Sequence, residues 1–349
     1  MGQMKTIYVK TTGTCNLNCD HCFTNGKSGD KTQFDPEVTA AWIKDFMSHH
    51  DAQTHYHFEF HGGEPFLVPI AKLEHFASLF DGRPESISMC GNSNLTFKLT
   101  DEIVEFMERR FDKRIGTSWD HWIRWDNEKQ FALWRKNLQL LKARGFYIGL
   151  KVSVSKQMVA ADPDWVLDQL ESFEVDSISL ERLTIGGNSH WHPDIFPDNT
   201  AQDEWYLALL KRYQERKPKC KIGTLDTLVR KIRDNVVKAD TNCRNCEQNL
   251  VTINSNGTLG GCPNMAIEHR HATIEESAQE FLISDGRVNE IATELDFKPN
   301  CTYCDVFDLC GGDCHRLPWQ GDRCGGLKHT LRYLSGRTDP QLANLIFKG

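Results

Sequence analysis

The sequence predicts an α/β fold, a partial (β/α)6 TIM-like barrel followed by a C-terminal domain rich in cysteine. Short apolar segments alternate with amphipathic ones from residue 7 to residue 183, which is typical of a parallel sheet covered by helices. Hydrophobic residues make up 39% of the 349 residues, enough for a large core. Of the 13 cysteines, eight lie beyond residue 240. The chain therefore combines an ordinary barrel pattern with a segment of unusual chemistry.

The first strand is expected at residues 7–9, where Ile-Tyr-Val leads into a cysteine-rich loop. Further strands are expected at 56–61, 86–89, 114–119, 147–154 and 177–183. Helices are expected at 36–49, 70–80, 101–111, 130–144, 165–173 and 203–216. The spacing of Val38, Ala41, Trp42 and Phe46 indicates one apolar face for the helix at 36–49. Gly145 marks the end of the helix at 130–144.

A boundary is expected at Lys217-Pro-Lys-Cys220, which divides the chain into a barrel at 1–216 and a second domain at 217–349. Within the second domain, residues 251–259 have the pattern of a β-hairpin with a type I′ turn at Asn256-Gly257. The hairpin leads to Cys262, so we expect it to present that cysteine as a ligand.

Composition argues against several classes of function, although it leaves room for a local basic patch. The 41 basic and 48 acidic residues leave a net charge of -7, the wrong sign for a nucleic-acid partner. No apolar run approaches the ~20 residues that cross a membrane, and the first ten residues lack the pattern of an export signal. We therefore expect a cytoplasmic protein with no membrane partner. In a reducing compartment, 13 cysteines indicate metal ligation or redox chemistry rather than disulfides.

The first cysteine cluster has the spacing C-x3-C-x2-C, formed by Cys15, Cys19 and Cys22. A structural zinc ion or an ordinary four-iron cluster takes four ligands. Three thiolates on one loop leave a coordination position open, as a catalytic site requires. The alternative is a zinc site completed by His21 or by a distant residue.

A second motif follows about 40 residues later, where an apolar strand ends in Gly62-Gly63-Glu64-Pro65. Glycines allow a ligand to approach the backbone closely. Glu64 is suited to accept a hydrogen bond from an ammonium group. Alone, the motif is equally compatible with an ordinary strand-to-helix turn.

Together, the two motifs resemble those of the radical S-adenosylmethionine (SAM) superfamily, including an aromatic residue, His21, before the last cysteine. The resemblance implies that Cys15, Cys19 and Cys22 hold a [4Fe–4S] cluster whose open iron chelates SAM. It also implies that Gly62, Gly63, Glu64 and Pro65 contact SAM. One electron then cleaves SAM to a 5′-deoxyadenosyl radical, which abstracts a substrate hydrogen atom.

The last third resembles the SPASM domain of peptide-modifying radical SAM enzymes. Cys246-x10-Gly257-x4-Cys262, Cys301-x2-Cys304-x5-Cys310-x3-Cys314 and a final Cys324 match its pattern, and Cys243 is an upstream eighth ligand. The resemblance implies two auxiliary [4Fe–4S] clusters. One takes Cys243, Cys246, Cys262 and Cys314, and the other takes Cys301, Cys304, Cys310 and Cys324. Because eight thiolates would ligate the two clusters completely, neither leaves an iron open, which favours electron transfer over direct binding of the substrate. The alternative is a pair of structural zinc sites.

Further contacts to SAM are expected near the strand ends. By resemblance, Arg124 is a candidate for binding the SAM carboxylate, against the alternative of a solvated loop arginine. Asn92 and Ser118 are candidates to line the pocket, with a plain structural hydrogen bond as the alternative. Cys90 and Cys220 stand apart from the motifs and are expected to be core thiols.

The resemblance implies an oxidoreductase that modifies a peptide, with crosslink formation in a ribosomally made peptide as the first hypothesis. Pro263 follows Cys262 where formylglycine-forming relatives carry an aspartate, which argues against that reaction. Because about six residues precede the first strand, we expect leader recognition by a separate protein or by the catalytic domains themselves, unless the substrate has no leader. A flavodoxin- or ferredoxin-type protein is expected to donate electrons. The alternatives are a small-molecule radical SAM enzyme in natural-product biosynthesis and a non-catalytic, zinc-stabilised binding protein.

Overall fold

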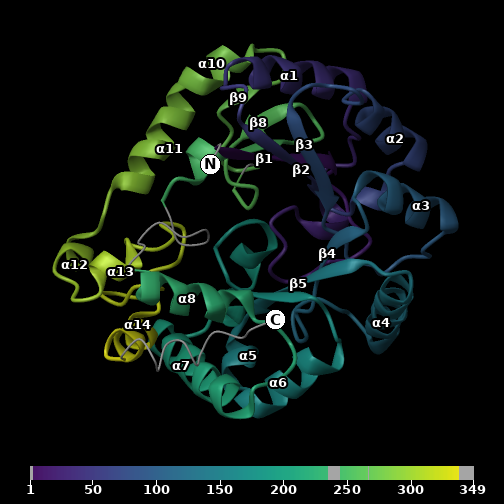
Figure 1. Ribbon diagram of the computed structural model, residues 1–349. Coiled ribbons are helices and arrows are strands. Elements are labelled where there is room, and N and C mark those ends of the chain that lie inside the picture. The colour runs from purple at the N-terminus through teal and green to yellow at the C-terminus, as the bar shows by residue number, and fades with distance from the viewer. Residues whose placement is uncertain (1–2, 235–243, 266, 338–349) are drawn as a thin grey trace.

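A computed structural model describes residues 3–234, 244–265 and 267–337 of the chain (Figure 1). Strands β1 (Met4–Thr12), β2 (His55–Gly62) and β3 (Ser86–Gly91) pair in parallel within a six-stranded sheet of order β3-β2-β1-β7-β8-β9. Strands β4 (Arg114–Ser118), β5 (Tyr147–Val154) and β6 (Ser177–Arg182) form a parallel three-stranded sheet. A parallel bridge from Asn92 to Gly116 joins the two sheets. The predicted α/β fold class with a partial barrel is confirmed.

Helices surround the outer face of the barrel (Figure 1). They are α1 (Pro36–Ser48), α2 (Ile70–Ser78), α3 (Asp101–Arg110), α4 (Glu128–Ala143), α5 (Lys156–Ala160), α6 (Pro163–Ser172), α7 (Asn199–Arg216) and α8 (Gly223–Asp234). The expected face of α1 is wrong in part, because Val38 and Ala41 are exposed. The buried row is Thr39, Trp42, Ile43 and Phe46, which recurs at the i, i+3, i+4, i+7 spacing of one helical face.

The two faces of each barrel strand differ in chemistry. On β2, Tyr56, Phe58 and Phe60 are buried against the helices, whereas His55, His57 and Glu59 alternate with them on the inner face. On β5, Ile148, Leu150, Val152 and Val154 are buried, and Lys151 is exposed on the other side. The inner face of the barrel is therefore polar and reached by water.

The C-terminal third contains α9 (Cys246–Asn249), β7 (Leu250–Ile253), β8 (Thr258–Gly260), β9 (Ala272–Thr273), α10 (Ala278–Ile283), α11 (Asp285–Leu295), α12 (Pro299–Thr302), α13 (Phe307–Cys310) and α14 (Lys328–Ser335). Strand β7 extends the barrel sheet by pairing in parallel with β1. Helix α14 packs on α7 and α8. Residues just after the expected boundary also contact the barrel, since Ile222 pairs with Ile178. A division at residue 217 stays a prediction.

The hairpin of β7 and β8 is confirmed, but its expected type I′ turn is wrong. That turn needs a positive φ at both central residues. Gly257 has a φ of 82°, while Asn256 is not among the residues with positive φ. The Gly257 N–H donates to Asn254 O (2.9 Å), and the Asn254 N–H donates to Thr258 O (2.9 Å). This is a three-residue loop with glycine at its left-handed position.

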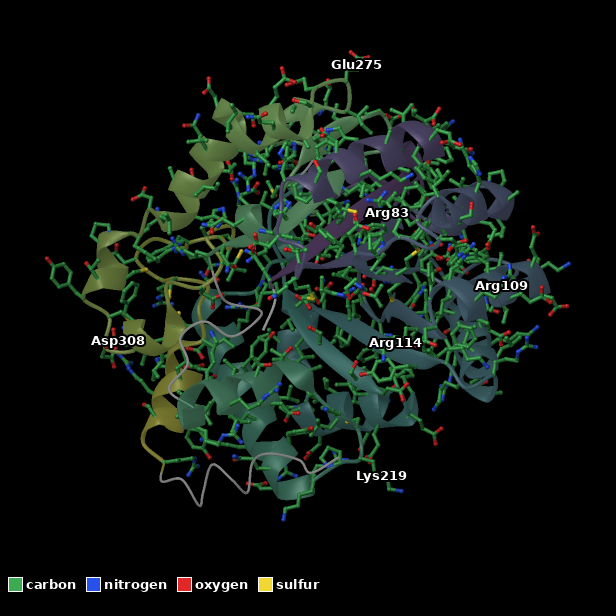
Figure 2. All side chains as sticks on the ribbon, turned by 45° about the horizontal axis from the view of Figure 1, so that its top comes forward. Arg83, Arg109, Arg114, Lys219, Glu275 and Asp308 are labelled. Atoms are coloured by element: carbon green, nitrogen blue, oxygen red, sulfur yellow. The ribbon has the colours of Figure 1, made fainter. Side chains whose placement is uncertain are left out.

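Side chains fill the space between the strands and helices, and labelled charged residues such as Arg109, Lys219, Glu275 and Asp308 lie at the periphery (Figure 2). Within the described ranges, no helix is both long enough and apolar enough to span a bilayer.

Candidate functional site

The loop after β1 carries Cys15, Cys19 and Cys22 and is folded by its own backbone. The Cys15 N–H donates to Gly26 O (3.0 Å), and the Cys22 N–H donates to Cys19 O (3.1 Å). Backbone N–H groups also point at sulfur, from Leu17 to Cys15 Sγ (3.4 Å) and from Gly26 to Cys22 Sγ (3.2 Å). Amides directed at sulfur are one of the contacts that tune thiolate-bound clusters.

Burial sets the acidity of these thiols. It raises the pKa of Cys15 to about 11, and it raises the pKa of Cys19 still further although the Arg124 charge acts in the opposite direction. Neighbouring cysteine charges contribute to both shifts, so the three side chains lie within electrostatic reach of one another. Metal ligation requires deprotonated sulfur. A cation bound at this loop would therefore have to displace their protons.

Glu64 organises the neighbouring loop. Its side chain is 0% exposed, and its carboxylate accepts hydrogen bonds from Phe66 N (3.2 Å), Ser93 Oγ (3.0 Å) and Asn94 N (2.7 Å). Burial raises the pKa of Glu64 to about 7. Asn94 Nδ2 in turn donates to Cys15 Sγ (3.2 Å). The structure thus gives Glu64 protein donors, and its expected contact with an ammonium group stays a prediction.

The two glycines before Glu64 allow the end of β2 to lie against the start of the cysteine loop. The Gly63 N–H donates to Thr12 O (2.8 Å), and the Glu64 N–H donates to Thr14 O (3.0 Å). A Cβ at Gly63 would come within 1.9 Å of Thr14 O. Gly62 has a φ of 126°, which disfavours other residues. These glycines set the backbone position one residue before Cys15.

The Arg124 side chain is 13% exposed and ion-paired, which does not fit the alternative of a solvated loop arginine. Its Nε donates to Asp120 Oδ2 (2.6 Å), and His21 Nε2 lies 3.3 Å from the same oxygen. Asp120 Oδ1 accepts from Ser153 N (2.6 Å). Burial acts to raise the pKa of Asp120, but the charges of Arg124 and His21 outweigh it and hold that pKa far below its ordinary value. Arg124 therefore places a fixed positive charge beside the Cys19 loop.

The other candidate residues of the barrel lie in different environments. Asn92 lies on the inner face, where its Nδ2 donates to Glu59 and its Oδ1 accepts from Lys151 Nζ. Ser118 ends β4 and is half-buried. Cys220 is a core thiol as expected. The same expectation for Cys90 is wrong, because it alternates onto the inner face and its Sγ donates to Arg114 O (3.5 Å).

Cys262 and Cys314 lie near each other, since charge on Cys314 contributes to the raised pKa of Cys262, which burial brings to about 11. Lys10, which is 2% exposed, donates from Nζ to the carbonyl of Pro263, next to Cys262 (2.9 Å). Burial lowers the pKa of Lys10 to about 8, while charges on Cys262 and Cys22 act against that shift. Lys10 thus lies between the first cysteine loop and the C-terminal cysteines. Cys243 lies outside the described residues.

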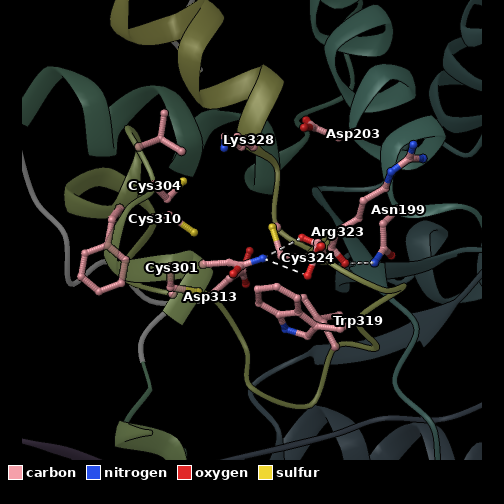
Figure 3. A pocket seen from close by; sticks show the side chains of 18 of the residues that line it. Asn199, Asp203, Cys301, Cys304, Cys310, Asp313, Trp319, Arg323, Cys324 and Lys328 are labelled. Carbon is pink, nitrogen blue, oxygen red and sulfur yellow. Dashed lines mark hydrogen bonds between the residues drawn. The ribbon is translucent and has the colours of Figure 1, made fainter. Parts of the chain in front are cut away.

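Four cysteines expected to share a cluster, Cys301, Cys304, Cys310 and Cys324, line one cavity of about 460 Å³ (Figure 3). Cys310 and Cys324 both lie close to Gly326, since a Cβ at that glycine would be 3.6 Å from each Sγ. The shared cavity fits a cluster held by these four thiolates, and it is also lined by Cys314. Among the described residues, no group of three or more His, Cys, Asp or Glu side chains could hold a metal ion. A four-iron cluster differs from one ion in that its ligands are distributed over several irons.

A buried ion pair ties this cavity to the barrel. At the end of β6, Arg182 donates from Nη1 to Asp313 Oδ2 (2.6 Å) and from Nη2 to Asp313 Oδ1 (2.7 Å). Its Nη1 also donates to Gly325 O (2.9 Å), next to Cys324. Sequence reasoning missed Arg182, Lys10 and Asp120. The alternation of His55, His57 and Glu59 with aromatic residues on β2 was a usable signal for a polar inner face.

No family model and no curated protein matches the chain. Solved structures do match it. The structure of anSMEcpe with bound AdoMet (SAM) has a TM-score of 0.78 and 17% identity and covers 98% of this chain and 99% of its own. With bound AdoMet and the Cp18Cys peptide, anSMEcpe has a TM-score of 0.77, 17% identity and the same coverage of the two chains. SuiB of Streptococcus suis, bound to precursor peptide SuiA, has a TM-score of 0.63 and 13% identity and covers 90% and 72%.

At identities this low, the structural matches establish the fold alone. Because the anSMEcpe match spans nearly the whole chain, it includes the cysteine-rich third as well as the barrel. The chain therefore has the same fold as anSMEcpe, both in the barrel and in the cysteine-rich third.

Proposed function

We propose that this protein is a radical SAM oxidoreductase that modifies a peptide. The observation that carries the proposal is the Cys15, Cys19 and Cys22 loop at the carboxyl end of β1, in a fold shared over 98% of the chain with a protein that binds AdoMet. Active sites of barrel enzymes lie at this end of the strands. The three thiols and the Gly62-Gly63 turn meet there.

When bound, a four-iron cluster and SAM supply the electron and the radical that abstracts a hydrogen atom from the substrate. The chain's own residues position these groups. Cys15, Cys19 and Cys22 hold the cluster, Gly62 and Gly63 allow the close backbone approach, and Arg124 offers a guanidinium to the SAM carboxylate. Asp120 fixes the orientation of that guanidinium through its 2.6 Å hydrogen bond.

A peptide substrate is supported by two of the matching structures, anSMEcpe with the Cp18Cys peptide and SuiB with precursor peptide SuiA. For the bond formed, we propose a crosslink within a ribosomally made peptide. That reaction is an oxidation, and two fully ligated auxiliary clusters are suitable electron acceptors. Pro263 after Cys262 lacks a carboxylate, which disfavours formylglycine formation. We further propose a flavodoxin- or ferredoxin-type electron donor and a separate leader-binding protein.

The proposal is tested by replacing Cys15, Cys19 and Cys22 together with alanine. Anaerobically purified wild-type protein should be brown and contain ~12 iron atoms per chain, the content of three four-iron clusters. The triple variant should lose about a third of the iron and all formation of 5′-deoxyadenosine from SAM under dithionite.

Cys90→Ala is the matched control, because Cys90 is a half-buried thiol that we do not assign to any cluster. Its iron content and 5′-deoxyadenosine formation should equal those of the wild type. Colourless wild-type protein that contains zinc would refute the proposal in favour of a metal-stabilised binding protein. Formation of 5′-deoxyadenosine by the triple variant would remove the assignment of these cysteines.

A further inference from the structure

A continuous chain of hydrogen bonds runs along the inner face of β2 and β3. Glu59 Oε2 lies 3.0 Å from His57 Nε2, and His57 Nδ1 lies 2.9 Å from Ser88 Oγ. The same Ser88 oxygen lies 2.9 Å from His55 Nε2. His55 Nδ1 lies 2.8 Å from Ser86 Oγ. Each of these distances is that of a formed hydrogen bond.

The strand register creates this chain. In the parallel pairing of β2 and β3, His55 lies beside Ser86, His57 beside Ser88, and Glu59 beside Cys90. Side chains of alternate residues point to one face, so the histidines and serines interleave along that face. The chain ends at Ser86, the exposed first residue of β3, at the amino ends of the strands. Its other end, Glu59, is 9% exposed.

Charged and titratable groups surround Glu59 from several strands. Asn92 donates to its Oε1, and Lys151 from β5 donates to Asn92. Charges on His61 of β2, Tyr8 of β1 and Cys90 of β3 also interact with it. Burial acts to raise the pKa of Glu59, but the hydrogen bond from His57 and the charge of Lys151 hold that pKa below its ordinary value. Glu59 is therefore a carboxylate at neutral pH and can accept a proton.

We propose that Glu59 accepts the proton released when a substrate is oxidised inside the barrel, and that His57, Ser88, His55 and Ser86 carry this proton to solvent. The inference rests on the proposed function. After hydrogen-atom abstraction, a substrate radical becomes an oxidised product by losing one electron and one proton. Under the proposed function, an auxiliary iron–sulfur cluster held by the C-terminal cysteines would accept the electron. The proton leaves separately from the electron. At 9% exposed, Glu59 has little direct contact with water, so its hydrogen-bonded neighbours offer the route to solvent.

The relay balances atom by atom when both imidazoles carry their proton on Nδ1. The Glu59 O–H bond breaks as His57 Nε2–H forms, and His57 passes its Nδ1 proton to Ser88. Ser88 gives its own proton to His55 Nε2, and His55 passes its Nδ1 proton to Ser86, whose proton goes to water. Both rings then carry hydrogen on Nε2, which lets His57 donate to the ionised Glu59. Tautomer exchange of the two rings resets the chain.

A purely structural role for these residues, as cross-strand pairs that hold β2 to β3, makes a different prediction. Separate pairs respond separately, whereas a relay transmits a change at one end to the other. The relay therefore predicts that altering Glu59 reverses the tautomer of His55, which Glu59 does not contact.

The first test uses reconstituted enzyme labelled with [15N]histidine, with ring-nitrogen chemical shifts as the readout and no substrate. In Glu59→Gln, Asn92 Nδ2 keeps the amide oxygen at the position of Glu59 Oε1. The amide N–H donor therefore faces His57 Nε2. We expect His57 and His55 both to move their proton from Nε2 to Nδ1. In Glu59→Gln with Ser88→Ala, only His57 should move. Ser179→Ala, which removes a half-buried serine from β6 outside the chain, should change neither ring.

An unchanged His55 in Glu59→Gln overturns the relay, and so does a reversal of His55 that persists without Ser88. This test needs no SAM chemistry, so its failure is distinguishable from failure of the proposed function. The second test uses any peptide that the enzyme converts. Glu59→Gln should lower product formation by about 10²-fold or more, with 5′-deoxyadenosine still formed. Ser88→Ala should slow product formation and raise its solvent deuterium isotope effect. A Ser88→Ala rate equal to that of the wild type would exclude proton transfer through the chain.

Discussion

Replacing Arg182 with methionine tests how the barrel and the cysteine-rich third are held together. The side chains of Arg182 and Asp313 are only 11% and 5% exposed, and the two groups share a bidentate pair with distances of 2.6 and 2.7 Å. Methionine keeps most of the apolar stem but leaves the Asp313 carboxylate buried without its partner. Removing one member of a buried ion pair costs about 3–5 kcal/mol. The Gly325 carbonyl also loses a donor.

The assay is urea unfolding followed by circular dichroism, with iron content measured before unfolding. Arg212→Met is the matched control, because Arg212 pairs with Asp164 at a similar distance of 2.8 Å but the two side chains are 42% and 40% exposed. An exposed pair contributes about 0–1 kcal/mol. We expect the free energy of unfolding to fall several times further in Arg182→Met than in Arg212→Met.

A second substitution separates loss of the pair from loss of packing. Asp313→Asn removes the charge that Arg182→Met leaves uncompensated, so the double variant should recover part of the lost free energy of unfolding. If Arg182→Met is within about 1 kcal/mol of the wild type, the pair does not stabilise the fold and the reasoning from burial fails.

Three further outcomes are expected. Gly63→Ala should remove iron from the first cluster and leave the C-terminal iron in place, because the new Cβ would approach Thr14 O to 1.9 Å. Gly149→Ala is the control and should retain all iron, because its Cβ meets only Ser177 Oγ, at 3.6 Å. Asn94→Ala removes the N–H donor to Cys15 Sγ and should make the reduction potential of that cluster more negative, measured by redox titration with electron paramagnetic resonance. His315, whose Nε2 lies 3.9 Å from Glu290 Oε2, and Arg316, which donates to the same oxygen, lower the pKa of Glu290 to about 2. Glu290 therefore stabilises the fold above its ordinary pKa of 4.5 and loses this effect as the pH falls through about 2. Urea unfolding at several pH values should show a flatter dependence between pH 4.5 and 2 in Glu290→Gln; an unchanged slope would contradict the assignment.

The local pattern of apolar and polar residues was sufficient to predict most strands and helices of the barrel. The strand expected at 147–154 has those bounds because apolar and polar residues alternate along it and Gly145 ends the preceding helix. The helix at 36–49 was placed correctly, and its buried face was predicted in part. Trp42 and Phe46 are buried as expected, but Thr39 and Ile43 complete that face in place of Val38 and Ala41.

The candidate site, too, could be predicted from the sequence only in part. Cysteine spacing located the loops, because ligands close in sequence stay close in space. It could not reveal that Glu64 contacts Ser93 and Asn94, or that Lys10 reaches Pro263, since these partners are far apart along the chain. Nor could it find the Asp120 partner of Arg124, which depends on how the segment after β4 turns back on itself.

The parallel pairing of β7 with β1 has a consequence for how the protein folds. Strand β1 begins at residue 4, whereas β7, which pairs with its other edge, begins only at residue 250. The Lys5 side chain also bonds to Gln248 O, across 243 residues. Until that segment leaves the ribosome, one edge of β1 exposes unpaired N–H and C=O groups, which other chains can pair with. Contacts this distant in sequence also slow folding. We therefore expect a fragment truncated after α8 to aggregate, although it contains every strand of the barrel.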